Sequence, residues 1–426
     1  MSSLYSATQF PDDLRPYVTA GAVRTGDFRA VSGLFRLASV PRTADPLSWV
    51  AFALVLGASR SGHTCVDLSH ISLWAPEGSE DAGLHWPDDP AQWLAAVNSC
   101  GGLVCAPTER DAPPRKPFVL DGTRLYSARS YDEELKVAAF LRKATGEGRL
   151  TIVTGGPGSG KTTKVAETIV AHVQSTAGTD TVALAAPTGL AAKRMARALR
   201  GAVARVIAGG GADASAESLV AGLPKLTVHK LLKYNPVARV RWRFNRSDRM
   251  PYDLVVIDEV SMMPLSMMAR LLEAMKDGAR LILVGDPHQL ASVEAGTVLA
   301  DIVEASARGS VGVDQLDKKF RFPEGSPVDD IATHTKAGDA DGVSAAVRRH
   351  HGHNGGDGRF TWVDPVTDGP ALQNVARAVV EHARQLCRLA ADATTQEQYL
   401  ALLAERDSRS EEHTSELQSP DHLVCR

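Results

Sequence analysis

A lysine and a threonine, Lys161 and Thr162, end a glycine-rich run that reads G-x-x-x-x-G-K-T from Gly155. The pattern is typical of a phosphate-binding loop, where backbone N–H groups surround a phosphate and a lysine reaches the β- and γ-phosphates. The threonine hydroxyl of such a loop binds magnesium. The residues that the pattern predicts to contact nucleotide are Gly155, Gly156, Pro157, Gly158, Ser159, Gly160, Lys161, Thr162 and Thr163.

The segments on both sides of this run have the composition that such a loop requires. Residues 150–154 are apolar and β-branched, as expected of a buried strand, and residues 163–177 contain no Gly or Pro, so a helix can follow. The alternative is a glycine-rich turn before a purely structural helix. Because strand, loop and helix signals agree, we favour a site for ATP and Mg²⁺.

An acidic pair, Asp258 and Glu259, follows a second apolar run at residues 253–257. Carboxylates at the end of a buried strand can hold magnesium and activate an attacking water. We expect Asp258 to bind the metal together with Thr162, and Glu259 to act as the base. An Asp-Glu pair after a strand is also a common structural feature, and the preceding phosphate loop gives this one its weight.

A third apolar run, residues 281–284, leads into Gly-Asp-Pro-His-Gln-Leu at 285–290. From here the chain resembles superfamily 1 helicases, and the continuation Ala-Ser-Val-Glu-Ala-Gly at 291–296 resembles the RecD family, the alpha subunits of exodeoxyribonuclease V. The resemblance implies that Gln289 senses the γ-phosphate, although Gln289 could be a turn residue after Asp-Pro. It also implies that Arg321, in Leu-Asp-Lys-Lys-Phe-Arg-Phe, contacts that phosphate. Without the resemblance, Arg321 reads as a solvated cation.

Three further residues are candidate DNA contacts. The segments Ala-Pro-Thr-Gly-Leu-Ala and Thr-Val-His-Lys-Leu are similar to DNA-facing motifs of the family, which implies roles for Thr188, Thr227 and His229. A basic and aromatic run at residues 239–246 could stack on unpaired bases. It could equally be a hairpin with one apolar face, and we rank the structural interpretation first.

Composition limits the kinds of partner. The net charge is −3 and the sequence pI is about 6.5, so any DNA contact must come from a local groove rather than a uniformly basic surface. Residues 50–57 form an apolar run that is too short to span a bilayer, and the first residues lack the pattern of a signal peptide. We therefore expect no membrane contact and a cytoplasmic location.

Linker-like segments and changes of residue pattern along the sequence divide the chain into four expected parts. Residues 1–115 are expected to form a small, mainly helical N-terminal domain that binds a partner, and residues 116–322 an α/β motor domain with a RecA-like parallel P-loop sheet. Residues 323–407 are interpreted as the incomplete start of a second motor domain. The polar run 408–426 resembles nothing in the family and is interpreted as a non-native or disordered tail.

The resemblance implies an ATP-dependent helicase that moves 5′ to 3′ on single-stranded DNA, in a heterotrimer with RecB-like and RecC-like subunits that repairs double-strand breaks. The late helicase motifs of the family are not found in the chain. Two alternatives remain open: a stand-alone RecD-like or conjugative helicase, and a structural subunit that binds ATP without turnover.

Overall fold

The computed structural model describes most of the first three quarters of the chain and one later helix. The described residues are 10–41, 43–76, 84–156, 158–176, 180–208, 222–223, 225–237, 242–289, 295–307, 312–316, 325–350, 369–392 and 398. They fall into two compact units, Met1–Thr154 with Lys161–Gln315, and Gly155–Gly160 with Leu316–Arg426.

The N-terminal part of the first unit is built around one helix, α4 (Pro46–Ala58). Asp45 caps this helix by accepting a hydrogen bond from the Leu47 N–H, and ten of its residues are buried. Trp49 and Phe52 pack against aromatic rings of the neighbouring elements. The surrounding helices are α2 (Arg15–Thr19), α3 (Thr25–Leu37) and α5 (Pro90–Ser99), with short 3₁₀ turns η1 (Asp12–Leu14), η2 (Ser59–Ser61), η3 (Leu68–Trp74) and η4 (Pro107–Glu109).

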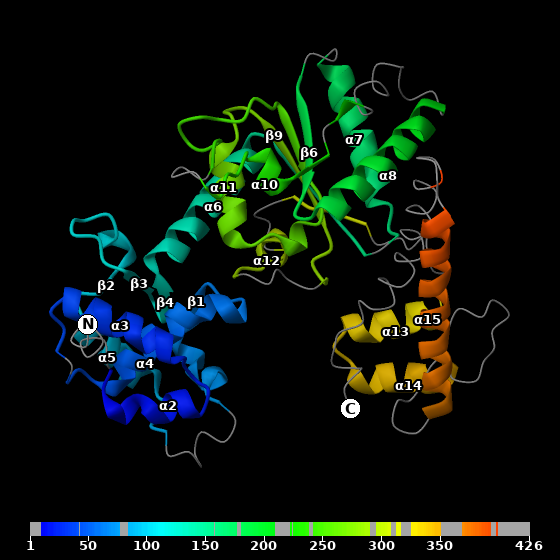
Figure 1. Ribbon diagram of the computed structural model, residues 1–426. Coiled ribbons are helices and arrows are strands. Elements are labelled where there is room, and N and C mark those ends of the chain that lie inside the picture. Colours follow the sequence, from blue (N-terminus) through cyan, green and yellow to red (C-terminus); the bar gives the residue numbers. More distant parts are fainter. Residues whose placement is uncertain are drawn as a thin grey trace. The chain divides into compact units, whose positions relative to one another are not determined.

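A four-stranded sheet completes this part, in the order β1-β4-β3-β2 (Figure 1). Its strands are β1 (Cys65–Asp67), β2 (Val104–Cys105), β3 (Phe118–Asp121) and β4 (Arg124–Ser127). The Asp-Gly pair at 121–122, which is typical of a hairpin turn, connects β3 to β4, and the pairing of this hairpin with β1 and β2 joins it to the helices before it. We therefore place the first domain boundary near residue 127 instead of 115.

The second part of the first unit is an α/β layer around a six-stranded sheet, in which every pairing is parallel. The order β10-β5-β9-β8-β6-β7 places the strand before the phosphate loop inside the sheet. The strands are β5 (Leu150–Thr154), β6 (Val182–Ala186), β7 (Lys225–Thr227), β8 (Leu254–Ile257), β9 (Arg280–Gly285) and β10 (Asp314–Gln315). This sheet confirms the expected α/β class.

Helices cover both faces of the sheet, as its nearly continuous apolar strands require (Figure 1). One face packs on α6 and α11 through the core cluster that includes Leu141, Met268 and Leu272; α7 and α8 pack together on the other side. The helices are α6 (Ala128–Gly146), α7 (Lys161–Ser175), α8 (Gly189–Ala208), α10 (Val228–Leu231), α11 (Leu265–Ala274) and α12 (Val298–Ala307), with η5 (Val260–Met262).

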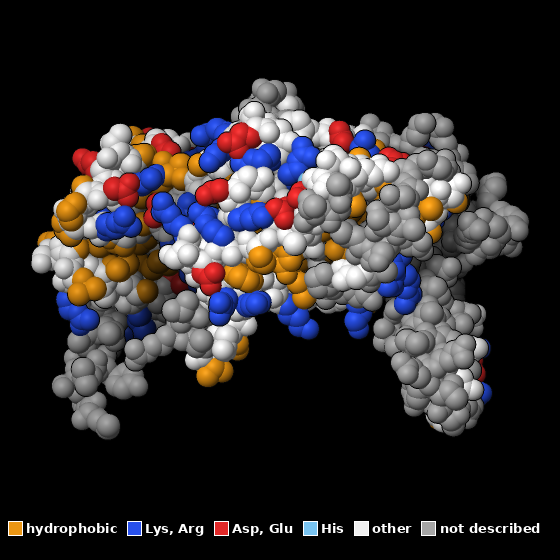
Figure 2. Space-filling model, turned by 90° about the horizontal axis from the view of Figure 1, so that it is seen from above, with side chains coloured by type: hydrophobic (Ala, Val, Ile, Leu, Met, Phe, Trp, Pro, Cys, Tyr) orange, Lys and Arg blue, Asp and Glu red, His pale blue; other side chains and the backbone are white. Residues whose placement is uncertain are grey.

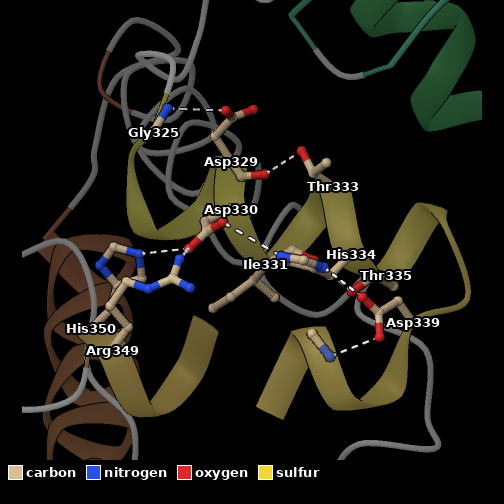
Figure 3. A network of polar contacts seen from close by, with 11 residues as sticks. Gly325, Asp329, Asp330, Ile331, Thr333, His334, Thr335, Asp339, Arg349 and His350 are labelled. Atoms are coloured by element: carbon tan, nitrogen blue, oxygen red, sulfur yellow. Dashed lines mark hydrogen bonds and ion pairs between the residues drawn. The ribbon is translucent and has the colours of Figure 1, made fainter. Parts of the chain in front are cut away.

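The described helices of the second unit are α13 (Pro327–Lys336), α14 (Ala340–His350) and α15 (Gly369–Asp392). A polar network ties the first two together (Figure 3). The Asp330 carboxylate contacts Arg349 Nη1 at 2.5 Å and His350 Nε2 at 3.0 Å, while His334 Nδ1 lies 2.9 Å from the Asp339 carboxylate. The Asp330 carboxylate therefore links α13 to the C-terminal end of α14.

Two expectations cannot be compared with the fold. The Ala- and Gly-rich sequence at 201–222 is typical of an exposed insertion, but it lies partly within α8, which ends at Ala208, and partly outside the described residues. The sequence at 396–405 predicts a helix and also falls almost entirely outside them. Among the described helices, none has the length and apolar character needed to cross a bilayer.

Candidate nucleotide-binding site

The loop between β5 and α7 has a backbone that only glycine adopts easily. Gly155, Gly158 and Gly160 have φ values of +153°, +75° and +89°. A Cβ atom on Gly155 would lie 2.5 Å from Ser159 Oγ and 2.7 Å from the Leu316 carbonyl oxygen, so no larger residue fits there. The Ser159 hydroxyl is buried and meets no hydrogen-bond partner among the described residues. The loop thus offers a tight backbone turn and a polar group in need of a partner.

Lys161 opens α7 and lies among three carboxylates. Burial lowers the pKa of its ammonium, while the charges of Asp286, Asp258 and Glu259 oppose that shift. These acids come from the carboxyl ends of β8 and β9, which are neighbours in the sheet. Parallel pairing therefore brings the lysine and the acidic residues of two separate sequence motifs to one edge of the sheet.

The acidic pair follows β8 directly. The Asp258 N–H donates to the Ala185 carbonyl oxygen at 2.9 Å, which fixes the strand end against β6. Glu259 has a φ of +54° and a ψ of +44°, the left-handed conformation, which is unusual for a residue with a side chain. Such a backbone costs about 1–3 kcal/mol and is concentrated at functional sites.

Both carboxyl groups of the pair are poorly stabilised as anions. Burial and the neighbouring Glu259 raise the pKa of Asp258 to about 7, and the Lys161 charge reduces that shift. Burial also raises the pKa of Glu259, which Lys161 and Arg194 oppose. The protein's own cations thus leave the carboxyl groups short of positive charge, as expected where a divalent cation is to bind.

The turn after β9 presents Asp286 and Gln289. Asp286 is buried, and its carboxylate accepts a 3.0 Å hydrogen bond from the His288 N–H. The Gln289 N–H donates to the Asp286 carbonyl oxygen at 3.2 Å, so Gln289 occupies a half-buried turn position. A Cβ on Gly285 would meet Leu299 Cδ2 at 2.6 Å, so a larger residue at the end of this strand would displace the Leu299 side chain of α12.

These residues fit a nucleotide and magnesium. The loop supplies turned backbone and the Ser159 hydroxyl, Lys161 supplies the cation for phosphate, and Asp258 supplies a carboxyl group that lacks compensating charge. Among the described residues, no group of three or more His, Cys, Asp or Glu side chains is arranged to hold a metal. Magnesium bound with nucleotide needs only one or two protein carboxylates, because phosphate and water provide the other ligands.

The remaining predicted site residues are only partly placed. Thr162 and Thr163 are half-buried in the first turn of α7. Gly156 lies in the loop, whereas Pro157 and Arg321 fall outside the described residues.

Two residues of the cluster were missed as site residues at the sequence level, Asp286 and Arg194. In the sequence Asp286 is visible only as part of a motif, and Arg194 only as one of several cations on an amphipathic helix. The half-buried Arg194 acts electrostatically on Glu259, so it is more than a solvated cation. The parallel pairing of β6 with β8, which the sequence does not reveal, is what brings α8 to the acidic pair.

The residues expected to contact DNA lie at the same carboxyl edge, on the neighbouring strands. Thr188 Oγ1 accepts from the Ala191 N–H and Thr227 Oγ1 accepts from the Lys230 N–H, each at 3.2 Å, so both hydroxyls cap helices. An added Cβ on Gly189 would lie 3.9 Å from the Thr227 methyl group, which shows that the two motifs adjoin. Each capping hydroxyl keeps its own proton for donation to a phosphate.

His229 is exposed on α10, two residues after Thr227. The basic and aromatic run near it is divided: Phe244 is buried, Trp242 is half-buried against the core, and Arg243 and Arg246 are exposed. This supports the structural interpretation for Phe244, as ranked first from the sequence.

Charge on the surface is mixed. Figure 2 shows Lys and Arg side chains interspersed with Asp and Glu on the face drawn. This agrees with the net charge of −3 and with the expectation that any DNA contact is local.

Comparison with known proteins assigns both parts of the first unit. Residues 20–126 match the family model described as RecBCD enzyme subunit RecD, N-terminal domain, and residues 138–295 match the AAA domain. The RecBCD enzyme subunit RecD of Mycobacterium tuberculosis is 36% identical over 403 residues, covering 88% of this chain and 65% of that protein. Over most of its length the chain is therefore similar to proteins of the RecD family.

Other relatives match in the same way. The RecBCD enzyme subunit RecD of Mycolicibacterium smegmatis is 36% identical over 406 residues, covering 87% of this chain and 66% of its own length. The ATP-dependent RecD2 DNA helicase of Deinococcus radiodurans is 38% identical over 169 residues, 40% of this chain and 20% of that protein. The chain spans slightly less than two thirds of the mycobacterial RecD proteins that it matches.

Proposed function

We propose that this RecD-like chain binds Mg²⁺-ATP through residues 155–163 and serves as the ATP-hydrolysing helicase subunit of a RecBCD-type exodeoxyribonuclease V. The observation that supports this best is the meeting of Lys161 with Asp258, Glu259 and Asp286 at one sheet edge, directly after the glycine-rich loop. Three largely buried carboxyl groups around one lysine leave an excess of negative charge, which a divalent cation would balance.

In the proposed site each residue has a separate task. The loop amides and Lys161 hold the phosphates, while Thr162 and Asp258 hold the magnesium ion, which neutralises developing charge when bound. Glu259 orients and deprotonates the attacking water, a role that suits a carboxyl group with a raised pKa. Gln289 and Arg321 are proposed to contact the γ-phosphate.

The DNA substrate and the partners follow from the family. We propose movement 5′ to 3′ on single-stranded DNA that passes Thr188, Thr227 and His229, inside a heterotrimer with RecB-like and RecC-like subunits. The match of residues 20–126 to the RecD N-terminal domain favours a RecBCD subunit over a stand-alone helicase. The similarity to the Deinococcus protein, by contrast, covers only 40% of the chain. A cytoplasmic location is proposed, as expected for a subunit that works on DNA.

Steady-state phosphate release tests the proposal. The chain, assembled with the RecB-like and RecC-like subunits of its own source, is assayed with and without a single-stranded oligonucleotide. We expect DNA-stimulated hydrolysis that Glu259→Gln reduces at least about 100-fold, within the usual range for loss of a general base. Nucleotide binding without any release above the Glu259→Gln background would instead identify a non-catalytic ATP-binding subunit.

A further inference from the structure

Three aromatic side chains form a cluster just beyond the second DNA-facing motif. The rings of Tyr234 and Trp242 have centroids 4.5 Å apart, and the ring of His229 lies 5.6 Å from Trp242 and 5.5 Å from Tyr234. Tyr234 and Trp242 also face each other in an isolated antiparallel bridge. The backbone therefore holds the two larger rings together, and α10 supplies the third.

The cluster differs from a core cluster in its exposure. His229 is exposed, whereas Tyr234 and Trp242 are half-buried, and Trp242 packs against the hydrophobic core. Phe244, two residues beyond Trp242, is only 8% exposed and packs under Lys233, whose Nζ lies 5.1 Å from the ring centroid. The ring of Phe244 is therefore buried, whereas solvent can reach the three rings of the cluster.

Positive charge surrounds the three rings. Lys230, Lys233, Arg243 and Arg246 are all exposed. Asp248 is the one acidic residue between positions 228 and 249, and its carboxylate pairs with Arg243 Nε at 3.2 Å. Accessible aromatic rings with cations around them are the usual composition of a surface that binds single-stranded nucleic acid.

The cluster also continues a line of predicted phosphate contacts. β7 ends at Thr227, α10 begins one residue later with Val228, and β7 pairs with β6 so that Ala186 stands opposite Thr227. A strand whose phosphates met the hydroxyls of Thr188 and Thr227 would therefore lie near the element, α10, that carries His229 of the cluster.

We propose that Tyr234 and Trp242, with His229, form a stacking platform for an unpaired base of single-stranded DNA. The inference rests on the proposed function, because it specifies how the same sheet edge meets its DNA. Phosphate contacts hold the strand without regard to its bases, whereas the aromatic platform contacts the flat face of a base and tolerates any sequence.

An oligonucleotide without bases separates the two kinds of contact. Fluorescence anisotropy is measured with labelled oligo-dT and with an abasic strand of equal length, using the full chain with Mg²⁺ and a non-hydrolysable ATP analogue. The variants are Trp242→Leu, Trp242→Phe and Tyr234→Leu, with Lys233→Ala as the charge control. Circular dichroism checks that each variant is folded.

We expect the wild type to prefer oligo-dT, and Trp242→Leu to weaken oligo-dT binding roughly tenfold, the size expected for loss of one stacked base. Its binding to the abasic strand should not change, and Trp242→Phe should retain most of the preference. Lys233→Ala should weaken binding to both strands by a similar factor. If Trp242→Leu does not fold, Tyr234→Leu gives the same comparison from the other large ring.

Each negative result has one meaning. Equal oligo-dT affinity for wild type, Trp242→Leu and Tyr234→Leu would overturn the stacking platform and leave the phosphate contacts in place. Equal loss on both strands would assign these rings a structural role only. No binding to either strand by the wild type would overturn the proposed DNA contact itself, and the platform with it.

Discussion

The backbone N–H of Gly296 donates a 3.0 Å hydrogen bond to the carbonyl oxygen of Gly62. Gly296 lies just before α12, in the segment that follows Gln289, and Gly62 ends the turn after α4 in the N-terminal part. The Thr64 hydroxyl and the Glu134 carboxylate of α6 form a second link between the same two parts. The nucleotide-binding part is therefore joined to the N-terminal part through its own motif segment.

Replacing Gly62 or Gly296 by alanine should lower the free energy of unfolding by different amounts. Both have positive φ, +80° at Gly62 and +102° at Gly296, so alanine is strained at each by about 1–2 kcal/mol. A Cβ on Gly62 has nothing within 4 Å, whereas one on Gly296 would lie 2.8 Å from Leu265 Cβ. We expect urea unfolding to show a loss of about 3 kcal/mol for Gly296→Ala and about 1 kcal/mol for Gly62→Ala.

Gly122→Ala is the control for this pair, because Gly122 has a φ of +61° and open space around it. It should match Gly62→Ala. If Gly296→Ala were no more costly than these two, the close packing of this segment on α11 would be wrong.

The raised pKa of Asp258 makes stability depend on pH in a defined direction. The native state keeps the proton up to about pH 7, while the unfolded chain releases it near pH 4, so the native state binds more protons between these values. The stabilising effect of this group is complete below pH 4 and is lost as pH rises toward 7. Relative to Asp258→Asn, the nucleotide-free wild type should lose about 1 kcal/mol per pH unit between pH 5 and 7.

Asp253→Asn provides the comparison by urea unfolding at the same two pH values. Contacts with Lys276 and Thr181 lower the pKa of Asp253 to about 2, so this carboxylate stabilises the protein above pH 4 and loses that effect only as pH falls toward 2. Its substitution should cost the same at pH 5 and pH 7. A pH-independent difference between wild type and Asp258→Asn would contradict the burial of that carboxyl group.

Much of the nucleotide site could be predicted because its signals are local. Buried parallel strands are continuous apolar runs, and the runs expected at 150–154, 253–257 and 281–284 form β5, β8 and β9 with shifts of at most one residue at an end. The glycine positions and the acidic pair are fixed by adjacent residues in the chain. Loop, strand and helix each carry their own pattern.

Features that depend on pairing between distant segments could not be predicted. β1 is three residues long and β2 only two, too short for any period to be visible, so the sheet of the N-terminal part and its boundary near 127 were missed. The place of Arg194 beside Glu259 depends on strand order. A cation on an amphipathic helix looks the same whether it faces solvent or an acid across the sheet.

Asp330 should matter for the second unit because one carboxylate joins two helices. The substitution Asp330→Ala removes the carboxylate that pairs with Arg349 and His350. We expect this loss to lower the local stability by about 1–2 kcal/mol. Hydrogen exchange of α13 and α14 amides, measured by mass spectrometry, reports this directly. Asp341→Asn, an exposed position in the first turn of α14, should change protection far less. Equal protection in both variants would show that the network of Figure 3 does not hold the helices together.

The central claim is that Lys161 binds the phosphates of ATP, and calorimetric titration with Mg²⁺ and a non-hydrolysable ATP analogue tests it most directly. Lys161→Ala should bind at least about 30-fold more weakly than wild type, because a charge-assisted contact in a closed site is lost. Lys164→Ala removes a cation one turn further along α7, 3.8 Å from Asp314, and should leave the affinity nearly unchanged. Wild-type affinity in a folded Lys161→Ala variant would contradict the assignment of the site.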